Sequence, residues 1–286
     1  MQCSSFISFV SHKGGILHCD ISLEYGGGGG ALFVEGTINT TITTTDCNFM
    51  NNNAQDDGGA LYCIGGVRGT LTITDSRFQF NTAGSAGGVI RSESGDVNIS
   101  ESDFTSNSVD KDGGVLYVHQ GTLTMFQTSF TNNKAKFGGV MWAQQATVRS
   151  HNVTIFNNSA DTDGGVFYTE QAGTVIAGAT FSHNRADNNG GGMHIDGGTT
   201  SISESKLDYY TAGIDGGVFY TRQAGTVIIG ATFSHNKADN NGGAMHIDRG
   251  TTNICESKFA YNTASNDGGV IRIDQGTLTI SENSGF

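Results

Sequence analysis

The stretch that decides the fold is GGVLYVHQGTLTMFQTSFTNNKAKF, from Gly113 to Phe137. It contains an apolar run, VLYV, an alternating run, TLTMF, and a third run, TSF, that leads into polar turn residues. Runs this short cannot be ordinary helices, and their β-branched and aromatic residues favour strands. The stretch therefore predicts three short strands and three turns.

The same unit recurs along the chain. From Gly87 onward its Gly-Gly pairs are 25 or 26 residues apart, and the pairs begin at Gly58, Gly87, Gly113, Gly138, Gly164, Gly190, Gly216, Gly242 and Gly268. Short strands repeated at a fixed period are typical of a solenoid, in which each repeat packs only on its neighbours. We therefore predict an all-β fold, a right-handed, single-stranded parallel β-helix (a solenoid), with about 26 residues and three short strands per coil.

The repeats predict a single β-helix domain over residues 1–286. Its coils are expected to be irregular over 1–57 and regular over 58–286. The segment beginning at Gly164 returns almost unchanged from Gly216, which is two coils later, so two coils were duplicated together. The last segment stops in the middle of a coil. We therefore expect a piece of a longer protein, or another subunit stacked on its ends.

Composition fits this fold and excludes several classes of function. The chain has 43 glycines and no proline, and the lack of proline suits coils that all donate backbone hydrogen bonds. A formal net charge of −12 argues against nucleic-acid partners, which need a basic surface. No stretch reaches the roughly 20 apolar residues of a membrane span, so no transmembrane segment is expected.

An F-x-x-N motif keeps the same period and predicts two structural columns. Residues at equal phase stack about 4.8 Å apart in such a fold. We expect a buried aromatic column and, three residues later, an amide ladder between coils. The aromatic residues are Phe78, Phe104, Phe130, Phe181, Phe233 and Phe259, and the ladder residues are Asn81, Asn107, Asn133, Asn158, Asn184, Asn236 and Asn262. Tyr210 replaces one asparagine and predicts a local irregularity.

The Gly-Gly column predicts a tight turn with positive φ or close backbone approach. A phosphate site is not expected there, because no P-loop lysine and no helix follow. An acidic column directly precedes it, namely Asp57, Asp112, Asp163, Asp215 and Asp267. These residues are turn formers in one interpretation. In the other their carboxylates form a row of Ca²⁺ sites, because that ion prefers oxygen ligands. No other cofactor is predicted.

Another column lies four residues after the first glycine of each pair. It consists of Tyr62, Arg91, Tyr117, Trp142, Tyr168, His194, Tyr220, His246 and Arg272. Its neighbours in the strand are apolar and point inward, so alternation directs this stripe outward. Exposed aromatic residues with histidine and arginine suit glycan stacking or lateral protein contact. The alternative is that amphipathic side chains simply cover a sheet face.

Two further sets of residues depend on the compartment. Sequons begin at Asn39, Asn98, Asn152 and Asn157, and they are N-glycosylation sites only in a protein secreted by a eukaryote. The cysteines are Cys3, Cys19, Cys47, Cys63 and Cys255. The lack of a CxxC pair argues against a zinc site. We expect a disulfide near the N-terminus, of undetermined pairing, with Cys255 free or bonded to another chain.

The GGA[ILV] and FxxN signatures together resemble the repeats of the polymorphic outer-membrane protein family, which are adhesins of the autotransporter type. GGALFV, GGALYC and GGAMHI carry the first signature, and FTSN, FTNN and FSHN carry the second, although several coils have GGV instead. Similar repeats occur in long proteins of protists that are predicted to lie at the cell surface. The resemblance implies a surface-exposed β-helical passenger with an adhesive role.

The sequence therefore favours a non-enzymatic extracellular or cell-surface rod with a structural or adhesive function. We expect it to stack end to end, or to continue into a longer surface protein or filament. Its expected partners are itself, other surface proteins and glycans. The alternatives are a glycan-binding module and a Ca²⁺-dependent polysaccharide lyase or hydrolase. A catalytic site should interrupt the repeat with long loops, and the coils from Gly87 to Gly268 leave no room for them.

Overall fold

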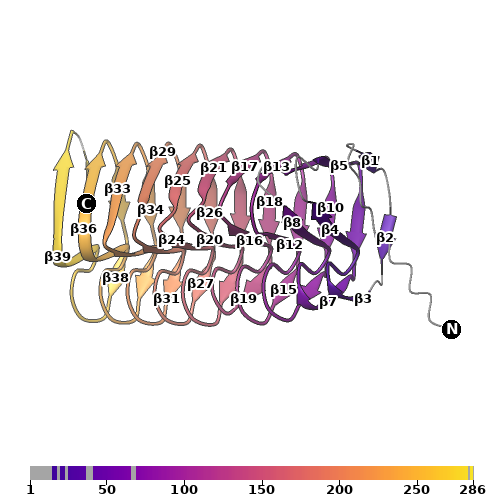
Figure 1. The fold of residues 1–286 in the computed structure, drawn as a ribbon. Coiled ribbons are helices and arrows are strands. Elements are labelled where there is room, and N and C mark those ends of the chain that lie inside the picture. The colour runs from indigo at the N-terminus through magenta and orange to yellow at the C-terminus, as the bar shows by residue number, and fades with distance from the viewer. Residues whose placement is uncertain are drawn as a thin grey trace.

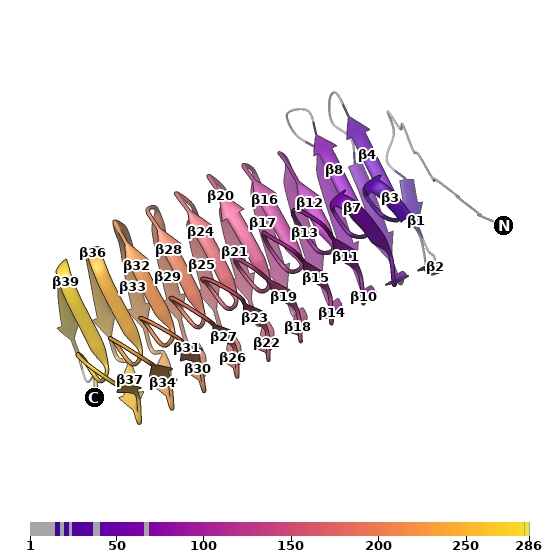
Figure 2. The ribbon, with the colours of Figure 1, turned by 90° about the horizontal axis from the view of Figure 1, so that it is seen from below.

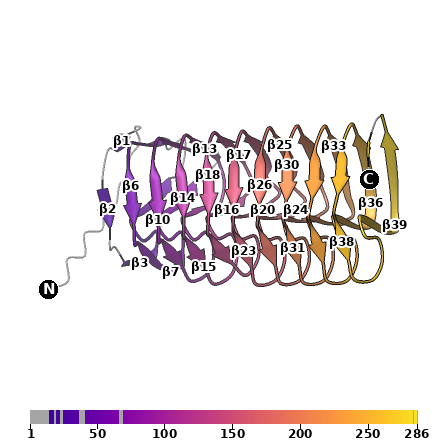
Figure 3. The same ribbon diagram turned by 180° about the vertical axis from the view of Figure 1, so that it is seen from behind.

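The chain winds into coils that stack along one axis. The computed structural model describes residues 15–17, 20–22, 25–36, 41–65, 69–282 and 284–285. The strands follow one another from β1 (Gly15–Leu17) at one end of the rod to β39 (Ile271–Ser281) at the other, as Figures 1 and 3 show from opposite sides. Cys3, Cys19 and Asn39 lie outside the described residues.

The strands form three parallel sheets. The first sheet contains β1, β4 (Leu32–Gly36), β5 (Thr41–Thr45), β8 (Leu61–Gly65), β9 (Thr70–Thr74), β12 (Ile90–Ser92), β13 (Asp96–Ser100), β16 (Leu116–His119), β17 (Thr122–Phe126), β20 (Met141–Gln144), β21 (Thr147–His151), β24 (Phe167–Glu170), β25 (Gly173–Ala177), β28 (Met193–Asp196), β29 (Thr199–Ser203), β32 (Phe219–Arg222), β33 (Ala224–Ile229), β36 (Met245–Cys255) and β39.

The other two sheets hold one short strand from each coil. The second contains β2 (Asp20–Ser22), β6 (Asn48–Met50), β10 (Arg77–Gln79), β14 (Asp103–Thr105), β18 (Ser129–Thr131), β22 (Thr154–Phe156), β26 (Thr180–Ser182), β30 (Lys206–Asp208), β34 (Thr232–Ser234) and β37 (Lys258–Ala260). The third contains β3 (Tyr25–Gly28), β7 (Asn53–Asp57), β11 (Thr82–Ala83), β15 (Ser108–Val109), β19 (Lys134–Ala135), β23 (Ser159–Ala160), β27 (Arg185–Ala186), β31 (Thr211–Ala212), β35 (Lys237–Ala238) and β38 (Thr263–Ala264).

The predicted parallel β-helix of short strands is confirmed, with one detail added. Most coils cross the first sheet in two strands, such as β16 and β17, which are separated by a turn at Gln120 and Gly121. Both turn residues have positive φ, at 64° and 83°. β36 and β39 instead run through this position without a break. Figure 2 shows the strands of successive coils side by side along the rod.

The phenylalanine column fills the centre of the coils. Phe78, Phe104 and Phe130 occupy equal positions in neighbouring strands of the second sheet, and none is exposed to solvent. The ring centroids of Phe78 and Phe104 are 4.7 Å apart, and their planes differ by 4°. Apolar burial and ring stacking therefore reinforce the backbone register from coil to coil.

The asparagine ladder holds the turn between the second and third sheets. Oδ1 of Asn133 accepts hydrogen bonds from the backbone N–H of Asn107, at 2.9 Å, and from its Nδ2, at 3.1 Å. Nδ2 of Asn133 donates to the carbonyl oxygen of Phe104 at 3.0 Å. Because these side chains are buried, each bond also removes the cost of an unpaired polar group.

The two glycines of each pair have different roles. Gly113 has a φ of 69°, a region that favours glycine. A Cβ on Gly114 would lie only 2.0 Å from the carbonyl oxygen of Gly139 in the next coil. The first glycine is therefore required by its conformation and the second by the close approach of the next coil.

Tyr210 interrupts the ladder but leaves the backbone regular. Its side chain is buried, its N–H donates to Oδ1 of Asn236 at 2.9 Å, and the strands on both sides keep their register. The predicted irregularity is therefore confined to the side chains. A Cβ on Gly192 would lie 2.9 Å from Cε1 of Tyr210, whereas Val166 and Val218 stand at this position in the neighbouring coils. The third glycine of the GGG run makes room for the tyrosine ring.

We expect Gly192→Ala to lower the free energy of unfolding by about 1–3 kcal/mol, because the added methyl group overlaps the ring of Tyr210. In a Tyr210→Asn background the same change should cost little, because the ring is absent. Urea unfolding of the wild type, both single variants and the double variant measures this coupling. Equal costs in the two backgrounds would contradict the packing explanation.

Candidate functional site

The predicted stripe forms a continuous stack on the outer side of the first sheet; we call it the mixed stack. Tyr117, Trp142 and Tyr168 are in register in β16, β20 and β24. The rings of Tyr117 and Trp142 lie 4.7 Å apart and differ by 8°. Those of Tyr168 and His194 are also 4.7 Å apart. The faces of these rings are therefore directed at each other, so their edges, rather than their faces, are directed outward.

Cations lie near both ends of the mixed stack, since Arg91 is its second member and Arg272 its last. The guanidinium of Arg91 lies 5.5 Å from the ring centre of Tyr62 and 4.7 Å from that of Tyr117. This distance suits a cation–π contact on both sides of the arginine. At the other end, Arg272 is in register with His246.

The stripe is less exposed than the sequence predicts. Its tyrosines, Trp142 and both arginines are half-buried, whereas His194 and His246 are only 5% exposed. The expectation of exposed histidines is therefore wrong. Burial also raises the pKa of Tyr168 to about 12, and the surrounding carboxylates add to this effect.

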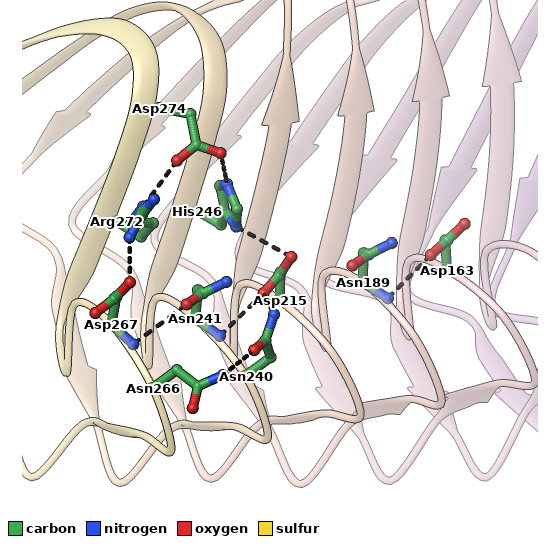
Figure 4. Close-up of polar contacts among 10 residues, drawn as sticks. All are labelled: Asp163, Asn189, Asp215, Asn240, Asn241, His246, Asn266, Asp267, Arg272 and Asp274. Carbon is green, nitrogen blue, oxygen red and sulfur yellow. Dashed lines mark hydrogen bonds and ion pairs between the residues drawn. The ribbon is translucent and has the colours of Figure 1, made fainter.

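Carboxylates lie beside the histidines and arginines of the mixed stack. We call the aspartates that directly precede the glycine pairs the aspartate column. Nδ1 of His246 lies 3.3 Å from Oδ2 of Asp215, and Nε2 lies 3.0 Å from Oδ2 of Asp274 (Figure 4). Arg272 contacts Asp274 from its other side and also reaches Asp267. One imidazole and one guanidinium thus connect three carboxylates at this end of the rod.

The same pairing occurs two coils earlier and again near the N-terminal end. Nδ1 of His194 lies 3.8 Å from Oδ1 of Asp163, and Arg91 lies 2.5 Å from Asp57. In these pairs the cationic or imidazole side chain comes from the coil after the aspartate. The aspartate column and the mixed stack, which look independent in the sequence, therefore form one strip.

The aspartate column alternates with uncharged residues along its whole length. Ala86 pairs with Asp57 and with Asp112, and Phe137 follows Asp112. In the later coils the side chains of Asp163 and Asp215 accept the backbone N–H groups of the asparagines that separate them from the next aspartate. Successive aspartates are therefore two coils, or about 9.6 Å, apart.

This spacing does not bring the predicted calcium ligands together. Ca²⁺ binds oxygen ligands at about 2.3–2.6 Å, so members of the column cannot share one ion. Within the described ranges, the one group of three or more potential metal ligands is Cys255, Glu256 and Glu282. It lies outside the aspartate column. Four carboxylates of the column have partners from the chain itself, namely those of Asp57, Asp163, Asp215 and Asp267.

The pKa values of two aspartates of the column are shifted in opposite directions. Burial alone would raise the pKa of Asp163, but neighbouring His194 and the hydrogen bonds from Asn189 together lower it below 3.8. Burial raises the pKa of Asp112, and nearby lysines only partly oppose this effect. Asp163 therefore stabilises the fold above pH 3.8, and this contribution is lost as the pH falls through its folded pKa. Ionised Asp112 has the opposite effect, since stability is lost as the pH rises through its raised folded pKa.

We therefore expect Asp163→Asn to lower the melting temperature at pH 7, with a smaller difference from the wild type near pH 3. Asp112→Asn is the matched control, since it should raise the melting temperature at pH 7 and lose this advantage toward acid pH. Thermal unfolding monitored by circular dichroism over this pH range measures both. Parallel shifts of the two variants would contradict the assigned environments.

A second stack, which the sequence analysis missed, is far more exposed; we call it the outer stack. His183, Tyr209, His235 and Tyr261 each precede the fourth residue of an F-x-x-N motif or its equivalent. Their ring centroids are 4.9, 4.7 and 4.9 Å apart in sequence order. Tyr209 is 49% exposed and Tyr261 is 77% exposed. Reading the column that directly precedes the ladder asparagines would have revealed this stack.

The backbone of the outer stack is strained. Its four residues have φ between 55° and 59°. Asn51, Asn132 and Asn157 occupy the same column in other coils, and asparagine tolerates this conformation better than bulky side chains do. Strained residues persist where the surrounding structure enforces them, and they cluster at functional sites. Ring stacking offsets part of this cost.

The remaining predicted residues are dispersed. Asn152 and Asn157 are exposed at turns, whereas Asn98 is half-buried in β13, and their glycosylation stays a prediction. Cys47 is buried, and Cys63 and Cys255 form no disulfide within the described residues. Cys3 and Cys19 lie outside this part of the chain, so the disulfide near the N-terminus stays a prediction.

Comparison with known proteins identifies the architecture. A family model described as a right handed beta helix region matches residues 30–207, which is more than half of the chain. No curated protein and no solved structure matches it. In the part of the chain that the structure describes, no helix has the length and apolar character needed to cross a bilayer.

Proposed function

Because the chain belongs to the right-handed β-helix family, we propose that it is a non-enzymatic adhesive rod located outside the cell or at its surface. The fold supports the general part of this proposal, since a β-helix is a rod-like domain suited to structural or binding roles. The adhesive role and the location go beyond the fold. They are supported by the exposed columns of side chains and by the resemblance to the repeats of the polymorphic outer-membrane proteins.

The outer stack carries the proposal. It places phenol and imidazole groups alternately at the surface, and Tyr209 and Tyr261 are among the most exposed large hydrophobic side chains of the described residues. Their edges offer hydrogen-bonding groups at the strand spacing, which suits a hydroxyl-rich partner such as a glycan. The strained backbone favours a functional reason for these residues, because asparagine would occupy the same turn at a lower cost.

The regular coils support a non-enzymatic role. From Gly87 to Gly268 the repeats stay at 25 or 26 residues, and their strands pair in register from coil to coil. Catalytic residues lie disproportionately on loops, and these coils carry no inserted loops. In this proposal the rod acts through its outer surface, and it stacks end to end or continues into a longer surface protein or filament. Its acidic net charge of −12 favours glycan or protein partners over nucleic acid.

We expect Tyr209→Asn combined with Tyr261→Asn to reduce glycan binding at least about tenfold, because each removed ring takes a contact surface away. Phe80→Asn is the matched control, since Phe80 is an exposed aromatic residue at the same type of turn, with a φ of 54°, and it lies outside the outer stack. A glycan array probed with the labelled chain, followed by titration of the best ligand, measures the effect.

The melting temperatures of these variants should not fall, because asparagine is favoured at positive φ. Equal binding by the wild type and the double variant would exclude the outer stack as the contact surface. Cleavage of an acidic polysaccharide in the presence of Ca²⁺ would instead favour the lyase alternative.

A further inference from the structure

A different surface of the first sheet carries a shallow apolar hollow. It lies on the outward side of β21, β25, β29, β33 and β36, which follow one another along the rod (Figure 1). One outward column of this surface reads Thr147, Gly173, Thr199, Gly225 and Thr251. We propose that this threonine–glycine face is the contact surface between two antiparallel copies of the chain, an interaction separate from the adhesive function proposed above.

The two glycines of the face have no backbone reason to be glycine. Neither has a positive φ. The nearest atom to an added Cβ is Oγ1 of Thr199, at 3.9 Å, for Gly173, and Cγ2 of Thr199, at 3.8 Å, for Gly225. Both distances are ordinary van der Waals contacts. Glycine weakens a strand, and within a strand it often marks the close approach of a ligand or of another backbone.

In the neighbouring outward column, valine stands in the coils that have glycine in the first column. It contains Val175 and Val227 in the coils with glycine, and Arg149, Ser201 and Asn253 in the coils with threonine. The two valines are 46% and 37% exposed. In the next column Ile229, which is 43% exposed, stands beside Ser203. In the coils of Gly173, Thr199 and Gly225, the larger side chain therefore alternates between the first two columns.

This pattern is complementary to itself under one symmetry. A two-fold axis between the coils of Thr199 and Gly225 makes the two rods antiparallel. It places Thr199 of each copy over Gly225 of the other, and Thr251 over Gly173. In the neighbouring column it places Val227 over Ser201. A parallel pairing in register through this column would instead set threonine against threonine and glycine against glycine.

The charge distribution also favours a second copy as the occupant. None of the outward residues within 173–177, 199–203, 225–229 and 251–255 is charged, although the chain as a whole has a net charge of −12. Two acidic rods repel each other over most of their surface, so an uncharged flat face is where they can meet. The four complementary strands, from β25 to β36, span about 19 Å at the usual strand spacing. This contact is small for a stable dimer, so we expect association at about 10 µM.

Sedimentation velocity between about 1 and 100 µM tests the pairing. The wild-type chain should shift from monomer to dimer mass over this range. The variant Gly173→Thr with Gly225→Thr should stay monomeric, because the added side chains fill the hollows. Its melting temperature should be equal or higher, since threonine favours strands, so a loss of folding cannot explain the result. Ser182→Thr with Ser234→Thr, on the second sheet, is the matched control and should dimerise normally.

A complementary pair of variants provides a rescue. A chain with Thr199→Gly and Thr251→Gly presents hollows where the first variant presents threonines. An equimolar mixture of these two variants, labelled with different fluorophores, should show energy transfer that the filled variant alone lacks. Rescue of this kind depends on the shape of the face.

Three results would overturn the proposal. The first is a wild-type chain that stays monomeric at 100 µM. The second is dimerisation that survives the filled hollows, because association through the ends of the rod is unaffected by them. The third is a monomeric chain whose threonine–glycine face binds oligosaccharides, since the hollow would then serve a glycan. None of these results bears on the outer stack, so the adhesive proposal is tested separately.

Discussion

The close approach of consecutive coils at the glycine pairs is the constraint on which the rest of the structure depends. A side chain at Gly114 would collide with the backbone of the next coil, so every coil must present a glycine at this point. The backbone hydrogen bonds, the phenylalanine stack and the asparagine ladder then repeat at the same spacing. A coil that changed its path would lose all of these contacts together, because they are shared with two neighbours. The fold is therefore held by many equal contacts rather than by one dominant centre.

Stacking at a single strand spacing also controls what the surface can display. Equal residues in adjacent coils lie about 4.8 Å apart, which favours aromatic rings and opposes like charges. The aspartate column follows this rule, since Ala86, Phe137 and two asparagines separate its members. The mixed stack follows it as well, because its arginines and histidines lie beside carboxylates of the column. The same geometry covers the faces of the rings, so these columns interact with partners through edges and polar atoms.

The sequence predicts features that repeat in every coil, and it fails where two columns meet. The period of Gly-Gly and F-x-x-N predicts the strands, the buried phenylalanines and the ladder, because each depends on equal residues at equal phase. The contact between Asp57 and Arg91 joins residues that differ both in coil and in phase, so spacing alone does not reveal it. The burial of His194 has the same origin, since its neighbours come from a turn of the preceding coil. Tyr209 escaped notice because its column resembles ordinary turn residues in most other coils.

The informative residues of a repeat are those that depart from local preference without a structural need. Gly192 has such a need, because Tyr210 fills the space beside it. Gly173 and Gly225 have none, yet they interrupt a column of threonines at alternate coils. Tyr209 and Tyr261 accept a conformation that asparagine adopts more easily, and they do so at the surface. Packing inside the rod explains the first departure. The other two lie on different outward surfaces, and neither improves the stability of a single chain, which is why we assign them to contacts with other molecules.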